Sequence, residues 1–322
     1  MNGRQSVSRR RVLGGLAASV GVAAGGYRAA AKARHSYDLR PQEVADGIWM
    51  IEGAPEYFTT ANGGAIVNCA IVETEAGLVI VDTGPSRRYG EAFKQALLQL
   101  SGRGIAEVII THHHPDHFFG NQVFADRPIR ALGETVRQCE LHGDGYADNL
   151  YRLLGDWMRG TEWIAPSAEI APGSFSVGGR IFQAVPLKGH SEADLALLDE
   201  RTGTVIAGDL AFLDRAPTTP SADLDAWRES LSALEAMQAA AILPGHGPFD
   251  RTGESLRQTR RYLDWLEDTL RTAANDGLDM VEVMDLPLPT EMAQLGAAED
   301  EFRRSVVHLF PRFEEEALPQ LN

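Results

Sequence analysis

Short apolar runs alternate with amphipathic segments along most of the chain. The runs are bounded by glycine or by polar turn residues, which is typical of β-strands. They predict strands at 47–52, 65–73, 77–82, 107–111, 181–187, 195–198, 204–207 and 241–243.

Other segments repeat their apolar residues at helical spacing. One starts after Ser86, a good helix N-cap, and runs to about Leu100 with Phe93 and Leu97 on one face. The same spacing predicts helices at 224–237, at 256–270 and from 290 to about 309, and an extra helical insertion at about 134–162. Strands with helices between and after them indicate an α/β sandwich.

Length and charge narrow the class of protein. The chain has 322 residues, enough for one large domain or two small ones, and its 44% hydrophobic and 23% charged residues are ordinary for a globular protein. Residues 1–33 hold six of the 30 basic residues and no acidic one, so the remainder has 24 basic against 45 acidic residues, a formal charge of −21. Such a body repels phosphate backbones, so we expect no nucleic-acid partner.

Residues 1–33 have the pattern of an export signal. Arg9, Arg10 and Arg11 precede an uncharged stretch from Val12 to Ala24, and Ala31-Lys32-Ala33 offers a cleavage site. The paired arginines favour the twin-arginine route and a periplasmic location. The apolar stretch is shorter than the roughly 20 residues that span a bilayer, so we expect no stable membrane insertion after cleavage. An uncleaved N-terminal anchor is the alternative.

Four histidines and one aspartate directly follow a predicted buried strand. The order is His112, His113, His114, then Asp116 and His117. Imidazole and carboxylate are ligands that suit zinc and iron. The spacing lets alternate residues point one way and the last two another, which predicts two adjacent metal sites, with His113 directed away from them.

Three further ligand candidates stand beside glycine at the ends of predicted strands. They are His190 after Gly189, Asp209 after Gly208, and His246 between two glycines. A lone histidine beside glycine is usually a turn residue, but the series as a whole indicates a metal centre. The remaining histidines, His35, His113, His142 and His308, are expected to be structural or solvated.

The set of motifs resembles the metallo-β-lactamase superfamily over about 41–250. The resemblance implies an αββα sandwich with metals at one edge of the sheets. It implies that His112, His114 and His190 hold the first metal, that Asp116, His117 and His246 hold the second, that Asp209 bridges them, and that Asp82 supports the ligands. The domain expectation is a signal peptide at 1–33, a metal-binding domain at 34–250 and a C-terminal helical extension at 251–322 packed on the sandwich.

Some branches of the superfamily are excluded by the residues themselves. Cys69 and Cys139 both precede His190, so the subclass with a later cysteine ligand does not fit; the two cysteines are either paired or free, with Cys69 expected to be buried. Diiron oxygen reductases of the superfamily have a His-x-Glu-x-Asp pattern, whereas this chain has His114 in place of the glutamate. The stretch between Asp209 and His246 is too short for the large domain that nucleases of the superfamily often insert there.

Several segments are similar to the quinoprotein relay system zinc metallohydrolases, a family related to SoxH. The similar segments are 62–68, 82–90, 262–266 and 306–314. This resemblance implies two zinc ions per chain, with iron as the alternative metal. It also implies a link to a PQQ-dependent quinoprotein system, and it leaves the substrate open.

The expected reaction is metal-assisted hydrolysis, in which a hydroxide between the metals attacks a thioester, ester or lactam carbonyl of a small molecule. Asp116 and Asp209 are the expected catalytic residues. Among the three bond types we expect thioester hydrolysis, as in glyoxalase II relatives of the superfamily. Two alternatives stay open: a mononuclear-iron persulfide dioxygenase, and a binding protein that holds a metal or quinone without turnover.

The substrate-contacting residues are less clear from the sequence. Tyr57, Phe58 and Asn62 precede a predicted strand, and Arg215 follows Asp209 closely enough to bind an anionic substrate or to lie on the surface. The aromatic residues of the helical insertion are expected either to contact the substrate or to pack locally; they are Tyr146, Tyr151, Trp157 and Trp163.

Overall fold

The structure is a computed structural model that describes residues 35–318. The chain divides into two compact units, Met1–Ser36 and Tyr37–Asn322, and the second contains both sheets. The expected export signal at 1–33 lies outside the described residues. No helix in the described part of the chain is both long and apolar enough to cross a bilayer.

The first sheet has seven strands in sequential order from β1 to β7. Neighbours from β1 to β4 are antiparallel, and those from β4 to β7 are parallel. The strands are β1 (Gln42–Ala45), β2 (Ile48–Ile51), β3 (Cys69–Thr74), β4 (Gly77–Val81), β5 (Ile105–Ile109), β6 (Ile129–Ala131) and β7 (Ala168–Glu169).

The second sheet has five strands in the order β12-β11-β10-β9-β8. Only β11 and β12 pair in parallel; the other neighbours are antiparallel. The strands are β8 (Gly173–Val177), β9 (Arg180–Leu187), β10 (Asp194–Asp199), β11 (Thr204–Phe212) and β12 (Ala241–His246).

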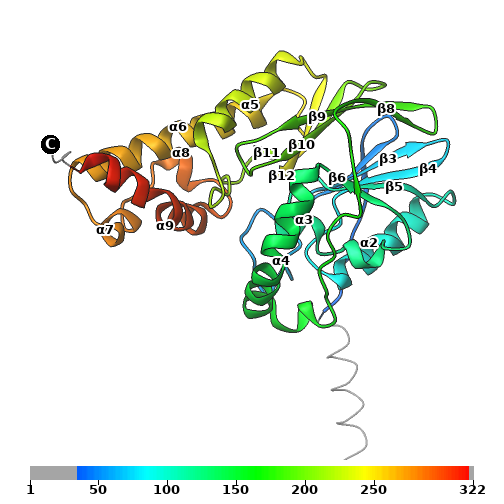
Figure 1. Ribbon diagram of the computed structural model, residues 1–322, viewed down its shortest axis with the longest axis horizontal. Helices are drawn as coiled ribbons and strands as arrows, with labels where there is room; N and C mark the ends of the chain where they lie inside the picture. Colours follow the sequence, from blue (N-terminus) through cyan, green and yellow to red (C-terminus); the bar gives the residue numbers. More distant parts are fainter. Residues whose placement is uncertain (1–34, 319–322) are drawn as a thin grey trace, which may run out of the picture. The chain divides into compact units, whose positions relative to one another are not determined.

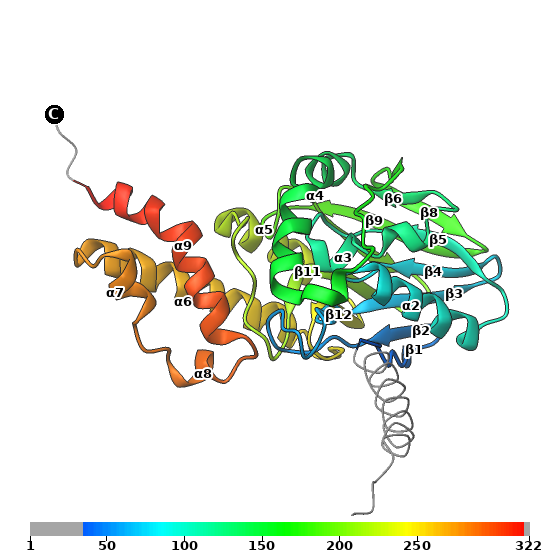
Figure 2. The same ribbon diagram turned by 90° about the horizontal axis from the view of Figure 1, so that it is seen from below.

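Helices cover both outer faces (Figures 1 and 2). The first sheet carries α2 (Arg87–Leu100) and α4 (Gly133–Leu154), and the second carries α5 (Leu224–Ala236) and α6 (Glu254–Asn275). The last helix, α9 (Ala298–Ala317), packs on α6. The shorter helices are α3 (Pro115–Phe118), α7 (Met280–Met284), α8 (Thr290–Ala293) and the 3-10 turns η1 (Asn121–Val123) and η2 (Gly155–Met158).

Three apolar clusters hold these layers together. One lies between the two sheets and includes Val79 and Leu195. The second packs Phe93 of α2 against the first sheet, and the third packs Leu263 of α6 against the second sheet and Phe302 of α9 against α6. The αββα sandwich with C-terminal helices is therefore confirmed. Because α6 and α9 share an apolar cluster with β11, residues 251–318 pack on the sandwich.

Local signals explain why several predicted elements begin where they do. Ser86 caps α2, and its hydroxyl accepts a hydrogen bond from the Tyr89 amide. Phe93 and Leu97 are buried on the face that covers the first sheet. The helix predicted from Ser86 to Leu100 is thus confirmed, and so is a helical insertion, formed by α4 and η2.

Several predicted boundaries were wrong. The strand predicted at 204–207 extends to Phe212, so Asp209 lies within β11 and not after its end. The strand predicted at 65–73 begins only at Cys69, because residues 62–68 form a glycine-containing loop. The helix predicted from 290 to about 309 is broken into α8 and α9. The break occurs where the Gly296 backbone pairs with Asp214 and Ala216, and a Cβ there would lie 2.4 Å from the Pro55 carbonyl oxygen.

Candidate metal centre

Seven buried side chains converge at one edge of the two sheets, contributed by four segments. His112 to His117 follow β5, His190 lies between β9 and β10, Asp209 lies within β11, and His246 ends β12. The metal-binding candidates form two groups, one of His112, His114, His190 and Asp209, the other of Asp116, His117 and His246. The two groups divide as the resemblance to the superfamily implied, with Asp209 expected to serve both.

The first group brings three ring nitrogens to a common point. Nε2 of His112 lies 3.0 Å from Nδ1 of His114 and 3.2 Å from Nε2 of His190. The His114 and His190 nitrogens are 2.8 Å apart. Tetrahedral zinc with nitrogen ligands at about 2.0–2.1 Å would separate those nitrogens by roughly 3.3 Å. The triangle is therefore close to the size that one zinc ion requires.

Asp209 faces both groups at once. Its Oδ2 lies 3.4 Å from Nε2 of His190 and 3.2 Å from Nε2 of His246. Its Oδ1 lies 3.2 Å from Nε2 of His117. Asp116 completes the second group, with Oδ2 3.4 Å from Nε2 of His246 and 3.7 Å from Nε2 of His117.

Close backbone packing fixes the position of Asp209. A Cβ at Gly245, in β12, would lie 1.9 Å from Oδ1 of Asp209. Only glycine leaves room for the carboxylate between the two parallel strands. Gly245 is thus a packing requirement; the sharp turn expected from a glycine at this position is absent, because Gly245 lies within β12.

The ring nitrogens that face away from the centre have partners of their own. Nδ1 of His117 donates to Asp82 across 2.7 Å, and Nδ1 of His246 donates to the Ile66 carbonyl across 2.7 Å. Asp82 also accepts hydrogen bonds from the Thr111 amide and hydroxyl. Such partners fix the tautomer and the ring orientation of a ligating histidine.

Electrostatics favour neutral imidazoles in the first group. Burial, followed by nearby imidazoles, holds the pKa of His112 and His114 well below the ordinary value, and burial lowers the pKa of His190 to about 4. A neutral imidazole is the form that binds a metal. Burial also opposes the charged form of His117, but Asp209 and Asp82 outweigh it and raise its pKa well above the ordinary value.

The donor set fits metal ions. Within residues 35–318, Nε2 of His117 and Oδ1 of Asp209 are buried and lie 3.2 Å from each other, without hydrogen-bond geometry to that or any other partner. Such atoms are costly to bury unless something else satisfies them. Imidazole nitrogens and carboxylate oxygens are suitable ligands for a divalent transition ion, which would supply that partner.

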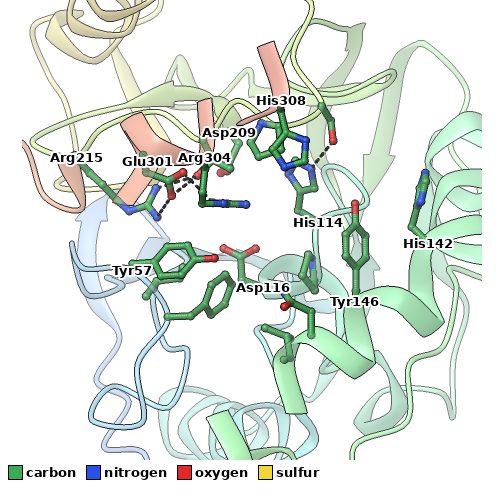
Figure 3. A pocket seen from close by; sticks show the side chains of 18 residues that line it. Tyr57, His114, Asp116, His142, Tyr146, Asp209, Arg215, Glu301, Arg304 and His308 are labelled. Carbon is green, nitrogen blue, oxygen red and sulfur yellow. Dashed lines mark hydrogen bonds and ion pairs between the residues drawn. The ribbon is translucent and has the colours of Figure 1, made fainter. Parts of the chain in front are cut away.

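The centre opens into a cavity of about 460 Å³, shown in Figure 3. Tyr57, Phe58 and Arg215, all proposed from the sequence, line this cavity. Arg215 is not a surface residue, since its side chain is only 1% exposed and pairs with Glu301. Asn62 does not line the cavity; its side chain bonds the Tyr57 carbonyl and the Thr59 and Gly64 amides, so it stabilises a turn.

The four aromatic residues of the helical insertion lie in different environments, and only one of them lines the cavity. Tyr146 lines the cavity, whereas Tyr151 is 44% exposed. Trp157 is buried and donates to the Thr60 carbonyl, and Trp163 donates to Asp144. His113 is buried and belongs to neither ligand group; its ring centroid lies 4.8 Å from that of His114 and 5.7 Å from that of His142. Cys69 and Cys139 are both buried and free.

Sequence reasoning missed the cavity wall contributed by α9 and by the segment before α5. Glu301, Arg304 and His308 of α9 line the cavity, as does Ser221, whose hydroxyl is 3.4 Å from Nε2 of His114. The residues of α9 had only a helical signal in the sequence, which carries no information about which side chains face the metal centre.

Comparison with known proteins agrees with this geometry. The sequence model of the metallo-beta-lactamase superfamily matches residues 62–246. The chain therefore belongs to the metallo-beta-lactamase superfamily, and we assign it to the metal-dependent hydrolases of that superfamily.

Individual relatives are distant. The chain is 26% identical to the linear primary-alkylsulfatase of Pseudomonas sp. (strain ATCC 19151) over 67% of this chain and 49% of that protein. It is 28% identical to the atrochrysone carboxyl ACP thioesterase of Aspergillus fumigatus over 56% of this chain and 50% of that protein. The chain thus spans about half the length of these two relatives. A solved beta-lactamase domain protein from Burkholderia ambifaria has the same fold, with a TM-score of 0.60 and 22% identity over 83% of this chain and 87% of that one.

Proposed function

We propose that this protein is a dinuclear zinc hydrolase that cleaves a thioester, ester or lactam of a small molecule. The observation that carries the proposal is the position of Asp209, whose two carboxylate oxygens face His190 of one ligand group and His117 of the other. A carboxylate placed in this way can bridge two metal ions. In this assignment His112, His114 and His190 hold the first zinc, and Asp116, His117 and His246 hold the second.

Two bound zinc ions would acidify a water molecule held between them and polarise the carbonyl of the substrate. The residues of the chain supply the rest of the chemistry. Asp209 and Asp116 orient the attacking water and accept its proton, since both carboxylates border the cavity. Asp82 keeps the His117 ring in place from behind, through Nδ1.

The bond class is supported by the relatives and by the cavity. An alkylsulfatase and a thioesterase both cleave an ester-type bond, and a cavity of about 460 Å³ suits a small molecule. We favour a thioester or ester over a lactam for this reason.

Location and partners follow from the sequence alone. The arginine triplet and the uncharged stretch of residues 1–33 support export by the twin-arginine route to the periplasm. The similarity to quinoprotein relay system zinc metallohydrolases supports a role beside a PQQ-dependent oxidation system.

The test is hydrolysis by the zinc-loaded protein of a panel of thioesters, esters, lactones and lactams. We expect turnover of at least one thioester or ester, abolished by a chelator and restored by zinc. A zinc-loaded protein that cleaves none of them, or an iron-loaded protein that consumes oxygen with a persulfide, would contradict the proposal.

A further inference from the structure

One wall of the metal-centre cavity is made by α9, which lies outside the segment matched by the superfamily model. Glu301, Arg304 and His308 follow one another on the face of this helix that borders the cavity. Figure 3 shows the Arg304 side chain extending into the middle of the cavity, over Asp116. A basic side chain therefore stands close to the proposed second metal site.

The charges on this wall do not balance. Oε1 of Glu301 lies 3.0 Å from Nη2 of Arg215, and its Oε2 lies 2.8 Å from Nη1 of Arg304. Two guanidinium groups thus share one carboxylate, which leaves one positive charge. Arg215 and Glu301 are almost completely buried, whereas the Arg304 side chain is 32% exposed. Arg304 therefore presents its guanidinium to the cavity, where the other carboxylate that acts on it is that of Asp116, a proposed ligand of the second metal.

Other groups hold Arg304 in position. Its guanidinium carbon lies 5.1 Å from the centroid of the Tyr57 ring, within the range of a cation–π contact. The chain just before α9 is tied to the segment after β11, because Gly296 exchanges backbone hydrogen bonds with Asp214 and Ala216. The element that carries Arg304 is thus connected to the strand that carries Asp209.

The Arg304 guanidinium has donors to spare. An arginine side chain has five N–H donors, and only Nη1 of Arg304 makes a hydrogen bond within residues 35–318. A planar guanidinium with free donors is suited to a carboxylate or to a sulfate-type group, which it can bind through two parallel hydrogen bonds.

We propose that Arg304 is a specificity-determining residue that binds an anionic oxygen group of the substrate while the reacting bond lies at the metal centre. Arg215 and Glu301 act as positioning residues, since Glu301 holds Arg304 and Arg215 neutralises Glu301 from behind. This inference deepens the proposed function and rests on it in one respect, namely that metal ions occupy the centre. The substrate class is then an ester or thioester that carries a negative charge away from the bond to be cleaved.

The experiment measures binding, so that it does not depend on turnover. Three thiols of similar length serve as probes of the zinc-loaded protein in calorimetry: 3-mercaptopropanoate, 3-mercaptopropane-1-sulfonate and 3-mercaptopropanamide. The thiolate binds zinc in each case, and the far end of the probe is a carboxylate, a sulfonate or a neutral amide. The variants are Arg304→Met, the charge-retaining Arg304→Lys and, as a matched control, Arg303→Met, because Arg303 is exposed on the same helix and does not line the cavity.

We expect the wild type to bind at least one of the acids about tenfold more tightly than the amide, the difference expected of one charge-assisted hydrogen-bonded pair. In Arg304→Met the preference should fall below about twofold while the Kd of the amide is unchanged. Arg304→Lys should keep part of the preference, and Arg303→Met all of it. Which acid binds more tightly distinguishes a carboxylate substrate from a sulfate-type one.

Arg304→Met with an undiminished preference for the acids would overturn the proposal, and so would equal binding of all three probes by the wild type. Failure of the proposed function has a different signature. In that case the zinc-loaded protein would keep its Arg304-dependent preference for acids but hydrolyse no ester or thioester.

Discussion

Oδ2 of Asp82 accepts a hydrogen bond of 2.7 Å from Nδ1 of His117, and both side chains are buried. Asp82 achieves this with a φ of 65°, in the left-handed region, which is uncommon for residues other than glycine although asparagine and aspartate adopt it more often than most. A side chain held in such a backbone conformation next to a ligand indicates a functional constraint.

Asp82→Asn should weaken binding of the second metal by about 10- to 100-fold, since the charge that supports His117 is lost. Asparagine tolerates the left-handed conformation, so the fold should be kept, as circular dichroism can verify. Chelator competition measures the affinity. Asp38→Asn is the control, because Asp38 is an exposed aspartate paired with Arg40; equal affinities in both variants would refute the role of Asp82.

Replacing His112, His114 or His190 by alanine should remove most of the first metal and abolish turnover. The reason is that these three nitrogens lie within 3.2 Å of one another, so a solvent molecule cannot replace one of them without loss of affinity. Metal analysis of the purified variants checks this. His142→Ala is the matched control, a histidine of the same cavity outside both ligand groups. Full metal content and activity in all three ligand variants would disprove the assignment.

Gly245→Ala should disturb the centre without removing any ligand. The added methyl group would lie 1.9 Å from Oδ1 of Asp209, so the carboxylate must move away from its position between the two ligand groups. We expect metal content to fall toward one ion per chain and hydrolysis to drop by at least about tenfold. Gly102→Ala, where a Cβ would meet nothing within 4 Å, should leave both unchanged. A fully loaded, fully active Gly245→Ala protein would be inconsistent with the packing described.

Changing Arg9, Arg10 and Arg11 together to lysine should leave unprocessed protein in the cytoplasm. All three are changed because Arg10 and Arg11 also form a pair. Cell fractionation followed by mass measurement of the protein distinguishes the forms. Normal processing and export of the triple variant would rule out the twin-arginine route.

The candidate ligands could be picked out from the sequence because each of them stands at or near the end of a strand. An apolar run predicts a strand, and a histidine or aspartate beside glycine marks where the strand ends, as at His190 and His246. Parallel and antiparallel strand ends then meet at one edge of the sandwich. The spacing within 112–117 even indicated the division into two ligand groups.

The α9 wall could not be predicted in the same way. Phe302, Val306 and Phe310 recur at helical spacing and indicate the buried face of a helix. Periodicity does not predict which residues Arg304 contacts, because those contacts depend on tertiary packing between α9 and the segment after β11. The break at Gly296 was missed for the same reason, because its cause is pairing with Asp214 and Ala216.

The central claim is that Asp209 joins two metal sites in a zinc hydrolase, and metal analysis of the wild type and of Asp209→Ala tests it most directly. We predict about two zinc ions per chain in the wild type and about one in Asp209→Ala, with a residual rate of hydrolysis, because His112, His114 and His190 still form a complete zinc site. In a mononuclear iron enzyme Asp209 would be the single carboxylate ligand, and its loss would empty the site. One iron ion per wild-type chain, together with oxygen consumption on a persulfide substrate, would contradict the account.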